Sequence, residues 1–265
     1  MSTITSAPRT PADVRHRPSL ATLLRAEVTD EIKLIYREPA ALFFSVLMPV
    51  MFFALFSAMF GGFEAEVGGV PTGTSMLATF GGYGVIVATM LTPAIGLAES
   101  RERGWLDVVK VSPVPVPVSL AARMIATVPY CIGILTAMTA TAAALGVLQI
   151  TLGQWLALLF ILIPGSLPFA LIGLAIGARA SGNATTAILN AIIIPLAIAG
   201  GLWFPLDQMP DWITGLAPAL PTYHLSQLAL APLDGSAWAG HVVYLLGFTV
   251  VAGIIATMTY RRSAQ

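Results

Sequence analysis

Long apolar stretches joined by short polar connections dominate this chain after residue 39. Six of them are each near the ~20 residues that a helix needs to cross ~30 Å of hydrocarbon. They are Ala40–Phe60, Ser75–Ala98, Val118–Leu148, Trp155–Ala178, Thr185–Phe204 and Gly240–Tyr260. The pattern predicts an all-α integral membrane protein with six transmembrane helices, whose membrane domain covers residues 39–262.

Composition supports a membrane protein. The chain is 57% hydrophobic and 10% charged, whereas a soluble domain carries about 25% charged residues. Its single cysteine, Cys131, lies in an apolar stretch, so we expect no disulfide framework. The first 39 residues are polar, so we expect no cleavable signal peptide.

Residues 1–38 predict a cytoplasmic tail followed by an interface helix. Ser19 is a suitable N-cap, and apolar residues then recur at helical spacing to about Glu38. A basic stripe of Arg25, Lys33 and Arg37 favours a helix lying on the membrane surface, facing lipid phosphates. Because Glu27 and Glu31 lie near the apolar face, a plain solvated helix leading into the first span stays open.

Basic residues predict the orientation of the spans. All 13 Lys and Arg fall on one side if the six stretches cross the membrane, and connections 61–74, 149–154 and 205–239 contain none. The positive-inside rule then places both termini and the segment Glu99–Pro117 in the cytoplasm. We expect the chain in the cell inner (plasma) membrane. The acidic residues on the outer side are Glu64, Glu66, Asp207, Asp211 and Asp234.

The segment Glu99–Pro117, between the second and third spans, is unusually rich in charge. Six ionisable residues fall within twelve positions, with Trp105 and Leu106 among them. Buried charges cost several kcal/mol in hydrocarbon, so we expect a short amphipathic helix outside the membrane, ended by Pro113, Pro115 and Pro117. The segment is either a solvated loop or a contact surface for a cytoplasmic partner.

Several kinds of chemistry are disfavoured by missing residues. No span interior contains Asp, Glu or Lys, which disfavours proton-coupled carriers and intramembrane aspartyl proteases. Neither Lys33 nor Lys110 follows a glycine, so no ATP-binding loop is present. We expect no catalytic residue, no metal site and no cofactor, and hence no enzyme; energy for pumping would come from another polypeptide.

The connection before the last span predicts short outer helices. Asp211 begins one of them, and Thr222 is a candidate cap for a second one that reaches Ala229. Trp203, Phe204 and other aromatic residues suit headgroup depth. A re-entrant hairpin and a surface-lying loop both fit this pattern.

Three motifs resemble those of type-2 ATP-binding cassette exporter permeases, including the daunorubicin/doxorubicin-resistance permeases. The resemblance covers nearly the whole chain. The motifs are Gly200-Gly201-Leu202-Trp203-Phe204-Pro205 with Met209-Pro210-Asp211-Trp212 and Pro221-Thr222-Tyr223-His224; Glu99-Ser100-Arg101-Glu102-Arg103-Gly104-Trp105-Leu106-Asp107; and Arg37-Glu38-Pro39. Trp105 stands where the family usually has a small hydroxylated residue.

The resemblance implies a complex of two permease subunits, identical or different, with two cytosolic ATPase subunits, amid membrane lipids and without nucleic acid. A cytoplasmic coupling helix between spans two and three would carry the ATPase contact. The implied ATPase-coupling residues are Glu99, Arg101, Glu102, Arg103, Trp105, Leu106 and Asp107. The candidate substrate-path residues are Thr89, Thr92, Asn183 and Asn190, for which helix–helix hydrogen bonding is the alternative. The candidate outer-gate residues are Trp203, Phe204 and His224.

The predicted function is outward export of hydrophobic or amphiphilic small molecules, with drug or antibiotic efflux first. Apolar walls without a buried charge suit such substrates. A lipid, glycan or ion exporter of the same class is the alternative, as are a non-transporting scaffold or sensor and an ion-coupled carrier.

Overall fold

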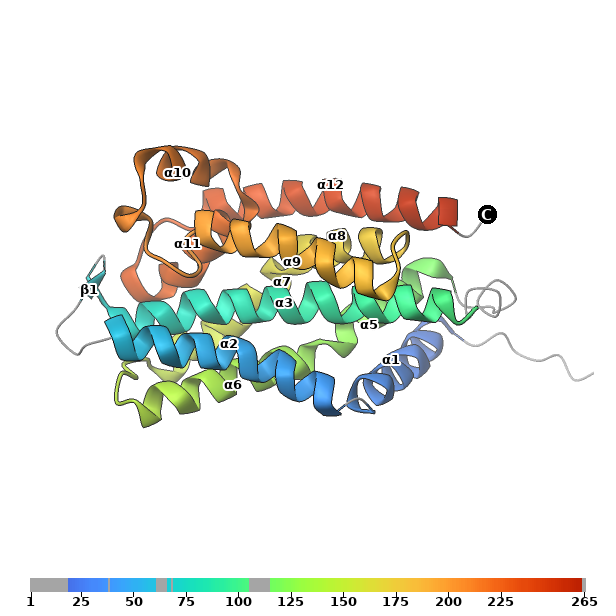
Figure 1. The fold of residues 1–265 in the computed structure, drawn as a ribbon, viewed down its shortest axis with the longest axis horizontal. Helices are drawn as coiled ribbons and strands as arrows, with labels where there is room; N and C mark the ends of the chain where they lie inside the picture. Colours follow the sequence, from blue (N-terminus) through green and yellow to red (C-terminus); the bar gives the residue numbers. More distant parts are fainter. Residues whose placement is uncertain (1–18, 38, 61–65, 68, 105–114, 264–265) are drawn as a thin grey trace, which may run out of the picture.

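A computed structural model describes residues 19–37, 39–60, 66–67, 69–104 and 115–263 as a bundle of helices (Figure 1). Two antiparallel strands of two residues each form a hairpin, in which Glu66 pairs with Pro71 and Val67 with Val70. The described elements are α1 (Leu20–Tyr36), α2 (Pro39–Phe60), β1 (Glu66–Val67), β2 (Val70–Pro71), α3 (Thr72–Glu102), α5 (Val116–Ala126), α6 (Val128–Ala144), α7 (Leu152–Gly165), α8 (Leu167–Gly177), α9 (Gly182–Ala199), η1 (Leu206–Gln208), α10 (Asp211–Leu216), η2 (Ala217–Ala219), α11 (Pro221–Asp234) and α12 (Ala239–Ser263).

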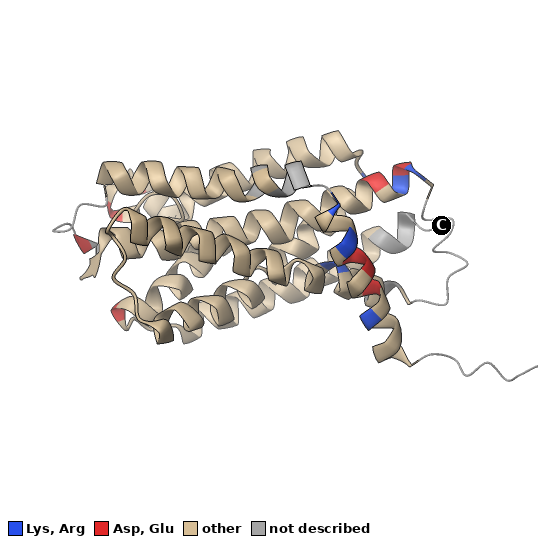
Figure 2. Ribbon diagram, turned by 90° about the horizontal axis from the view of Figure 1, so that it is seen from below, with Lys and Arg blue, Asp and Glu red and all other residues tan. Residues whose placement is uncertain are grey.

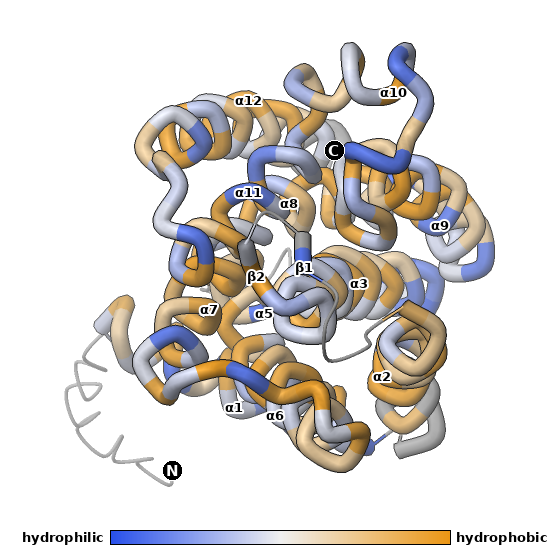
Figure 3. Tube along the Cα trace, turned by 90° about the vertical axis from the view of Figure 1, so that its left-hand side faces the viewer, coloured by the Kyte–Doolittle hydropathy of each residue, from blue (hydrophilic) through white to orange (hydrophobic). Residues whose placement is uncertain are grey.

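Helix α3 forms the centre of the bundle. It has 31 residues and contacts α2, α6, α7, α8, α9 and α11. Seen along the helices, α3 lies in the middle with the other helices around it (Figure 3). Phe80, Val85, Ile86 and Ala88 on this helix are completely buried. The sequence placed the second span at Ser75–Ala98, whereas the helix continues unbroken to Glu102.

Two glycines of α8 allow it to approach α3 closely. A Cβ added at Gly173 would lie 2.3 Å from the carbonyl oxygen of Met90, and one at Gly177 would lie 2.3 Å from that of Ala94. No side chain fits between these two backbones. The Gly-x-x-x-Gly spacing therefore serves helix packing within one subunit, as small residues commonly do in membranes.

Two of the predicted spans contain a break. The third is divided into α5 and α6 at Thr127, and the fourth into α7 and α8 at Ser166. Each break is followed by a proline, Pro129 or Pro168, in the first turn of the next helix. Proline has no N–H for the preceding turn, so its position allows the helix to change direction there.

The number of spans matches the prediction only in part. Among the described residues, five segments are long and apolar enough to cross a membrane: Thr72–Glu102, Val118–Ala144, Leu152–Gly177, Gly182–Ala199 and Ala239–Thr259. The first predicted span corresponds to α2, a 22-residue helix whose described apolar part is Val46–Phe60. The count of six spans stays a prediction.

The fifth span ends earlier than the sequence pattern indicated. The prediction extended it to Phe204, but α9 ends at Ala199. Gly201 has φ +76°, and the Leu202 N–H donates to the Ala197 carbonyl at 2.9 Å while the Gly201 N–H donates to the Ile198 carbonyl at 3.3 Å. These two bonds form a Schellman cap, and its left-handed glycine stops the helix.

The outer helices are inserted into the bundle to different depths. Helix α11 contacts α3, α7, α9 and α12, and its Leu225 is completely buried, so this helix does not lie on the surface. The exposed Trp212 of α10 is 72% accessible. Helix α11 begins at Pro221 and runs to Asp234, beyond the expected Ala229, because Gly235 in the left-handed conformation ends it.

Charge is divided between the two ends of the bundle. Figure 2 shows the coloured Lys and Arg residues gathered at the end where α1 lies, whereas the opposite end carries acidic residues. Helix α1 begins at the predicted cap, because the Ser19 hydroxyl accepts the Thr22 N–H at 3.2 Å. It packs along α5, and Arg25, Lys33 and Arg37 are exposed. Contact of this basic stripe with lipid, and which end faces the cytoplasm, stay predictions.

Candidate functional site

The last turn of α3 holds the junction between α8 and α9. The guanidinium of Arg101 donates to the carbonyl oxygens of Ala178 at 2.8 Å and Ala180 at 2.6 Å. These carbonyls follow the C-terminus of α8, where a positive charge complements the helix dipole. Arg101 therefore fastens the end of α3 to the chain that leads into α9.

The acidic residues of the same turn lie at the start of α9. A Cβ built on Gly182, the first residue of α9, would lie 3.2 Å from Cγ of Glu99 and 3.8 Å from Oε2 of Glu102. Carboxylates near a helix N-terminus are stabilised by its partial positive charge. Glu99 also pairs with the exposed Arg103 at 2.7 Å, and such surface pairs contribute little to stability.

The remaining predicted coupling residues, Trp105, Leu106 and Asp107, lie outside the described residues, as does the rest of the predicted coupling helix up to residue 114. Glu99, Arg101 and Glu102, which the sequence assigned to that segment, instead form the end of the second span. The described part of the site therefore consists of α3 and the α8–α9 junction.

A buried ion pair connects α1 to α5. The guanidinium of Arg123 lies 3.1 Å from Oε1 of Glu31, and their side chains are only 7% and 14% exposed. Burial raises the pKa of the Glu31 carboxyl; Arg123 opposes the shift, while Glu27 and Asp30 add to it. The imperfect amphipathicity of the first helix was the sequence signal for this pair: Glu31 lies among apolar positions because it faces an arginine.

Next to this pair lies a cavity of about 330 Å³, which we call the basic-end cavity. It is bounded by α1, α3, α5, α6 and the first turns of α9, and contains one predicted path residue, Thr92. Its lining residues are Glu31, Leu34, Ile35, Val87, Leu91, Thr92, Pro93, Ile95, Gly96, Glu99, Ser100, Arg103, Arg123, Thr127, Tyr130 and Thr186. This cavity contains a buried charge pair, since Glu31 from α1 and Arg123 from α5 both line it. The prediction of uncharged walls along the substrate path stays a prediction.

The other path residues do not share this cavity. The Thr89 hydroxyl is buried and donates to Val85 and Ile86 carbonyls of its own helix. The Asn190 side-chain amide donates to the Thr186 carbonyl at 2.9 Å, also within its helix. Asn183 is exposed in the first turn of α9.

Aromatic side chains pack beneath the predicted outer gate. Trp203 stacks on Phe52 with ring centroids 5.4 Å apart and meets Tyr83 edge-on at 5.0 Å. Phe204 meets Phe56 edge-on at 5.1 Å. The buried Nε1 of Trp203 has no hydrogen-bond acceptor among the described residues.

The third predicted gate residue, His224, belongs to a separate cluster. Its Nε2 donates to the Pro218 carbonyl at 2.9 Å, and its Nδ1 lies 2.8 Å from Nδ1 of His241. Because Nε2 carries the hydrogen that is donated to Pro218, Nδ1 of a neutral His224 accepts a hydrogen bond from the Nδ1–H of His241. His224 also stacks on Tyr244 at 3.7 Å, so it ties α11 to α12 and does not join Trp203 and Phe204.

A larger and mainly apolar cavity of about 740 Å³ lies between α7, α11 and α12, with Phe160, Leu228 and Leu246 among its walls. It contains none of the predicted site residues. As for metal sites, the described residues contain no group of three or more His, Cys, Asp or Glu side chains close enough to hold an ion.

Comparison with known proteins places these features in a family context. Residues 22–233 match the family model described as ABC-2 type transporter. The chain is also similar to the "Putative transport permease YvfS" of Bacillus subtilis (strain 168), with 22% identity over 242 residues, which covers 91% of this chain and 98% of that protein.

Proposed function

The chain belongs to the ABC-2 type transporter family, as a multi-pass membrane permease, and from this premise we propose that it exports hydrophobic or amphiphilic small molecules using a separate ATPase. Two permease and two cytosolic ATPase subunits form the complex. Among export activities of this kind, we propose drug or antibiotic efflux first.

The observation that carries this proposal is the connection from the end of α3 to α8 and α9. Arg101 makes two hydrogen bonds to carbonyls beyond α8, and hydrogen bonds from a charged group contribute about 1.5–3 kcal/mol each. At Met90 and Ala94, earlier in α3, Gly173 and Gly177 place the α8 backbone directly against the α3 backbone. A displacement at the end of α3 is therefore passed to α8 and α9 together.

The proposed contact with the ATPase is the segment Glu99–Lys110, whose first residues, up to Glu102, form the last turn of α3. Trp105 and Leu106 supply apolar anchoring in a cleft of the ATPase, and Arg103 stands at the rim. Arg101, whose donors bind Ala178 and Ala180, transmits the movement and does not dock. ATP binding thereby opens the substrate path along α3 and α9, where Asn190 lies.

Amphiphilic cargo is supported by the walls of both cavities. The larger one is mainly apolar, and the basic-end cavity combines apolar residues with a buried charge pair. Neither contains a ladder of ionisable groups along the bundle such as proton-coupled carriers use.

The test is uptake of labelled amphiphilic drugs into inverted vesicles that carry both the permease and its ATPase. We expect uptake that needs ATP and stops when the phosphate-binding lysine of the ATPase is replaced. Uptake that needs an ion gradient instead would make the chain a carrier. Failure of the two subunits to copurify would support a scaffold or sensor.

A further inference from the structure

The basic-end cavity has the two-sided chemistry of an amphiphile site. Arg123, Glu31, Glu99 and Arg103 contribute charges, and the hydrophobic walls include Leu34, Ile35, Val87, Leu91 and Ile95. The α1 wall contributes both Glu31 and apolar residues. A charged headgroup with an apolar tail would therefore find a complementary surface for each of its parts.

The two partners of the buried pair differ in how they tolerate separation. Arg123 is 7% exposed, and a guanidinium does not lose its proton in proteins. It must keep an anionic partner, since an unpaired buried charge is costly. Glu31 can become neutral by taking up a proton, because burial already raises its pKa.

The charged groups around Glu31 reinforce this asymmetry. Glu27 and Asp30 on α1 disfavour its ionised form, and Arg123 on α5 favours it. From α3, Glu99 and Arg103 line the same cavity but pair with each other at 2.7 Å. An incoming anion thus competes with Glu31 alone, whereas an incoming cation would leave Arg123 unpaired.

We propose that the basic-end cavity binds the anionic headgroup of an amphiphile, with Arg123 as the headgroup ligand and Glu31 as the carboxylate that it displaces. Glu31 takes up one proton when the headgroup replaces it. The site itself stands on the geometry of the cavity, and only the claim that the bound amphiphile is cargo rests on the proposed function.

The test uses decyl sulfate, whose headgroup keeps one negative charge throughout the range in which carboxylates and histidines titrate. Binding of the radiolabelled compound to the full-length chain in neutral detergent is measured by a scintillation proximity assay. Decanol and decyltrimethylammonium compete as uncharged and cationic probes of the same chain length. We expect unlabelled decyl sulfate to displace the radiolabelled compound effectively, and decanol and decyltrimethylammonium to displace it only weakly.

The dependence on pH distinguishes this site from simple adsorption. Above the pKa of Glu31, binding must be accompanied by uptake of one proton, so affinity should fall by about tenfold per pH unit. Below that pKa, affinity should be constant. In Glu31→Gln the side chain at position 31 is neutral at every pH, and Arg123 has no anionic partner from α1 until decyl sulfate binds. The folded variant should therefore bind more tightly than wild type at high pH and lose most of the pH dependence.

Replacing the headgroup ligand should abolish the site. Arg123→Gln removes a charge-assisted hydrogen bond, so it should weaken binding by about tenfold or more. If this variant does not fold because Glu31 is left unpaired, the double variant Glu31→Gln/Arg123→Gln removes both charges and tests the same point. Wild-type affinity in a folded single or double variant would overturn the proposal, as would a pH profile of Glu31→Gln identical to that of wild type.

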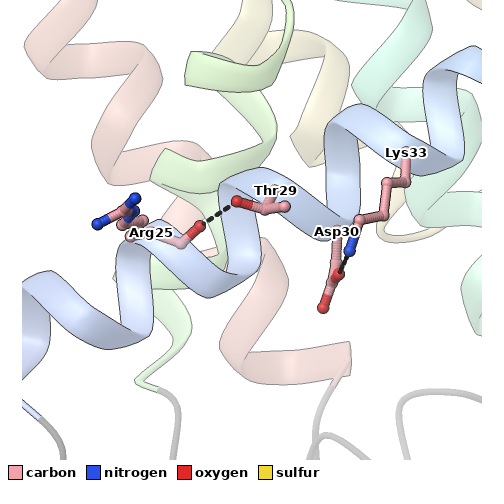
Figure 4. Close-up of polar contacts among 4 residues, drawn as sticks. All are labelled: Arg25, Thr29, Asp30 and Lys33. Carbon is pink, nitrogen blue, oxygen red and sulfur yellow. Dashed lines mark hydrogen bonds and ion pairs between the residues drawn. The ribbon is translucent and has the colours of Figure 1, made fainter.

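Two exposed residues of α1 provide matched controls, both visible in Figure 4. The backbone carbonyl of Arg25 accepts the Thr29 hydroxyl at 2.8 Å. The Arg25 side chain is exposed and does not line the cavity, so Arg25→Gln removes a positive charge outside it. Asp30 pairs with Lys33 at 3.0 Å in solvent, so Asp30→Asn removes a carboxylate next to Glu31. Both variants should bind decyl sulfate as wild type does at a pH below the pKa of Glu31, where binding takes up no proton. Equal losses in Arg25→Gln and Arg123→Gln would reduce the effect to overall charge and refute the site.

The amphiphile has two sources, a transported substrate or a lipid of the cytoplasmic leaflet. ATP-dependent uptake of decyl sulfate into inverted vesicles, reduced in Arg123→Gln, would identify cargo. Binding that depends on Arg123 without such uptake would identify a resident lipid. Since binding is measured without the ATPase, failure of the proposed exporter function would leave the binding result intact.

Discussion

The close approach of α3 and α8 predicts a large effect of one added methyl group. In Gly173→Ala the new Cβ would lie 2.3 Å from the Met90 carbonyl oxygen, whereas carbon–oxygen contacts normally lie at about 3.3–3.6 Å. The two backbones must therefore separate by about 1 Å, because a carbonyl cannot rotate away within its helix. Overpacking of this kind costs about 1–3 kcal/mol.

Gly133→Ala is the matched control, since nothing lies within 4 Å of a Cβ at Gly133. A glycine-to-alanine change in a helix stabilises by about 0.5–1 kcal/mol when the site is open. We expect Gly173→Ala and Gly133→Ala to differ by ~2–3 kcal/mol. At roughly 2–4 °C per kcal/mol for a large domain, Gly173→Ala should lower Tm by about 4–12 °C relative to the control.

The assay uses the single cysteine of the chain. Cys131 is completely buried, so a maleimide dye that fluoresces on thiol addition reports unfolding in detergent. A Tm for Gly173→Ala equal to that of Gly133→Ala would refute the backbone contact between α3 and α8. Without that contact, α3 and α8 would not be rigidly connected, and a movement of α3 would not be passed to α8.

Three further predictions concern topology, the path and the ATPase contact. In a Cys131→Ala background, a cysteine at Ser236 should react with an impermeant thiol reagent from outside, and one at Arg179 should react only after permeabilisation; the reverse pattern would invert the orientation. Asn190→Leu should change substrate preference in vesicle uptake and leave complex assembly intact, whereas loss of assembly would make Asn190 a packing residue. Trp105→Ala should reduce transport and substrate-stimulated ATP hydrolysis more than Arg103→Ala, because buried aromatic anchors contribute ~2 kcal/mol or more and rim charges little; wild-type values for both would refute the anchor.

The sequence predicted the elements that depend on local pattern. The length of the apolar stretches located the spans, and Ser19 identified the start of α1. The positions of the charged residues predicted that one end of the bundle is basic and the opposite end is acidic. Each of these signals lies within about one helix of the residues that it concerns, so periodicity and composition detect it. Family membership was also visible in short motifs such as Gly200–Pro205.

The features that were missed depend on contacts between distant residues. Glu31 and Arg123 are 92 positions apart, by subtraction of their numbers in the chain, and no spacing rule pairs them. The sequence placed Arg101 in a charged segment exposed to solvent, yet its hydrogen-bond partners are backbone carbonyls that follow α8. The end of α9 was misplaced because the apolar run continues past Ala199, and backbone geometry at Gly201 overrides hydropathy.

The central claim is that movement imposed at the Glu102 end of α3 reaches α8 and α9 through Arg101. The most direct measurement is the amount of substrate transported per ATP hydrolysed by the reconstituted complex. Arg101→Gln is compared with Arg179→Gln, which removes an exposed charge near the same junction, and the dye assay verifies that both variants are folded. The account predicts that Arg101→Gln hydrolyses ATP but transports several-fold less substrate per ATP, while Arg179→Gln matches wild type. Wild-type transport per ATP in a folded Arg101→Gln complex would contradict it.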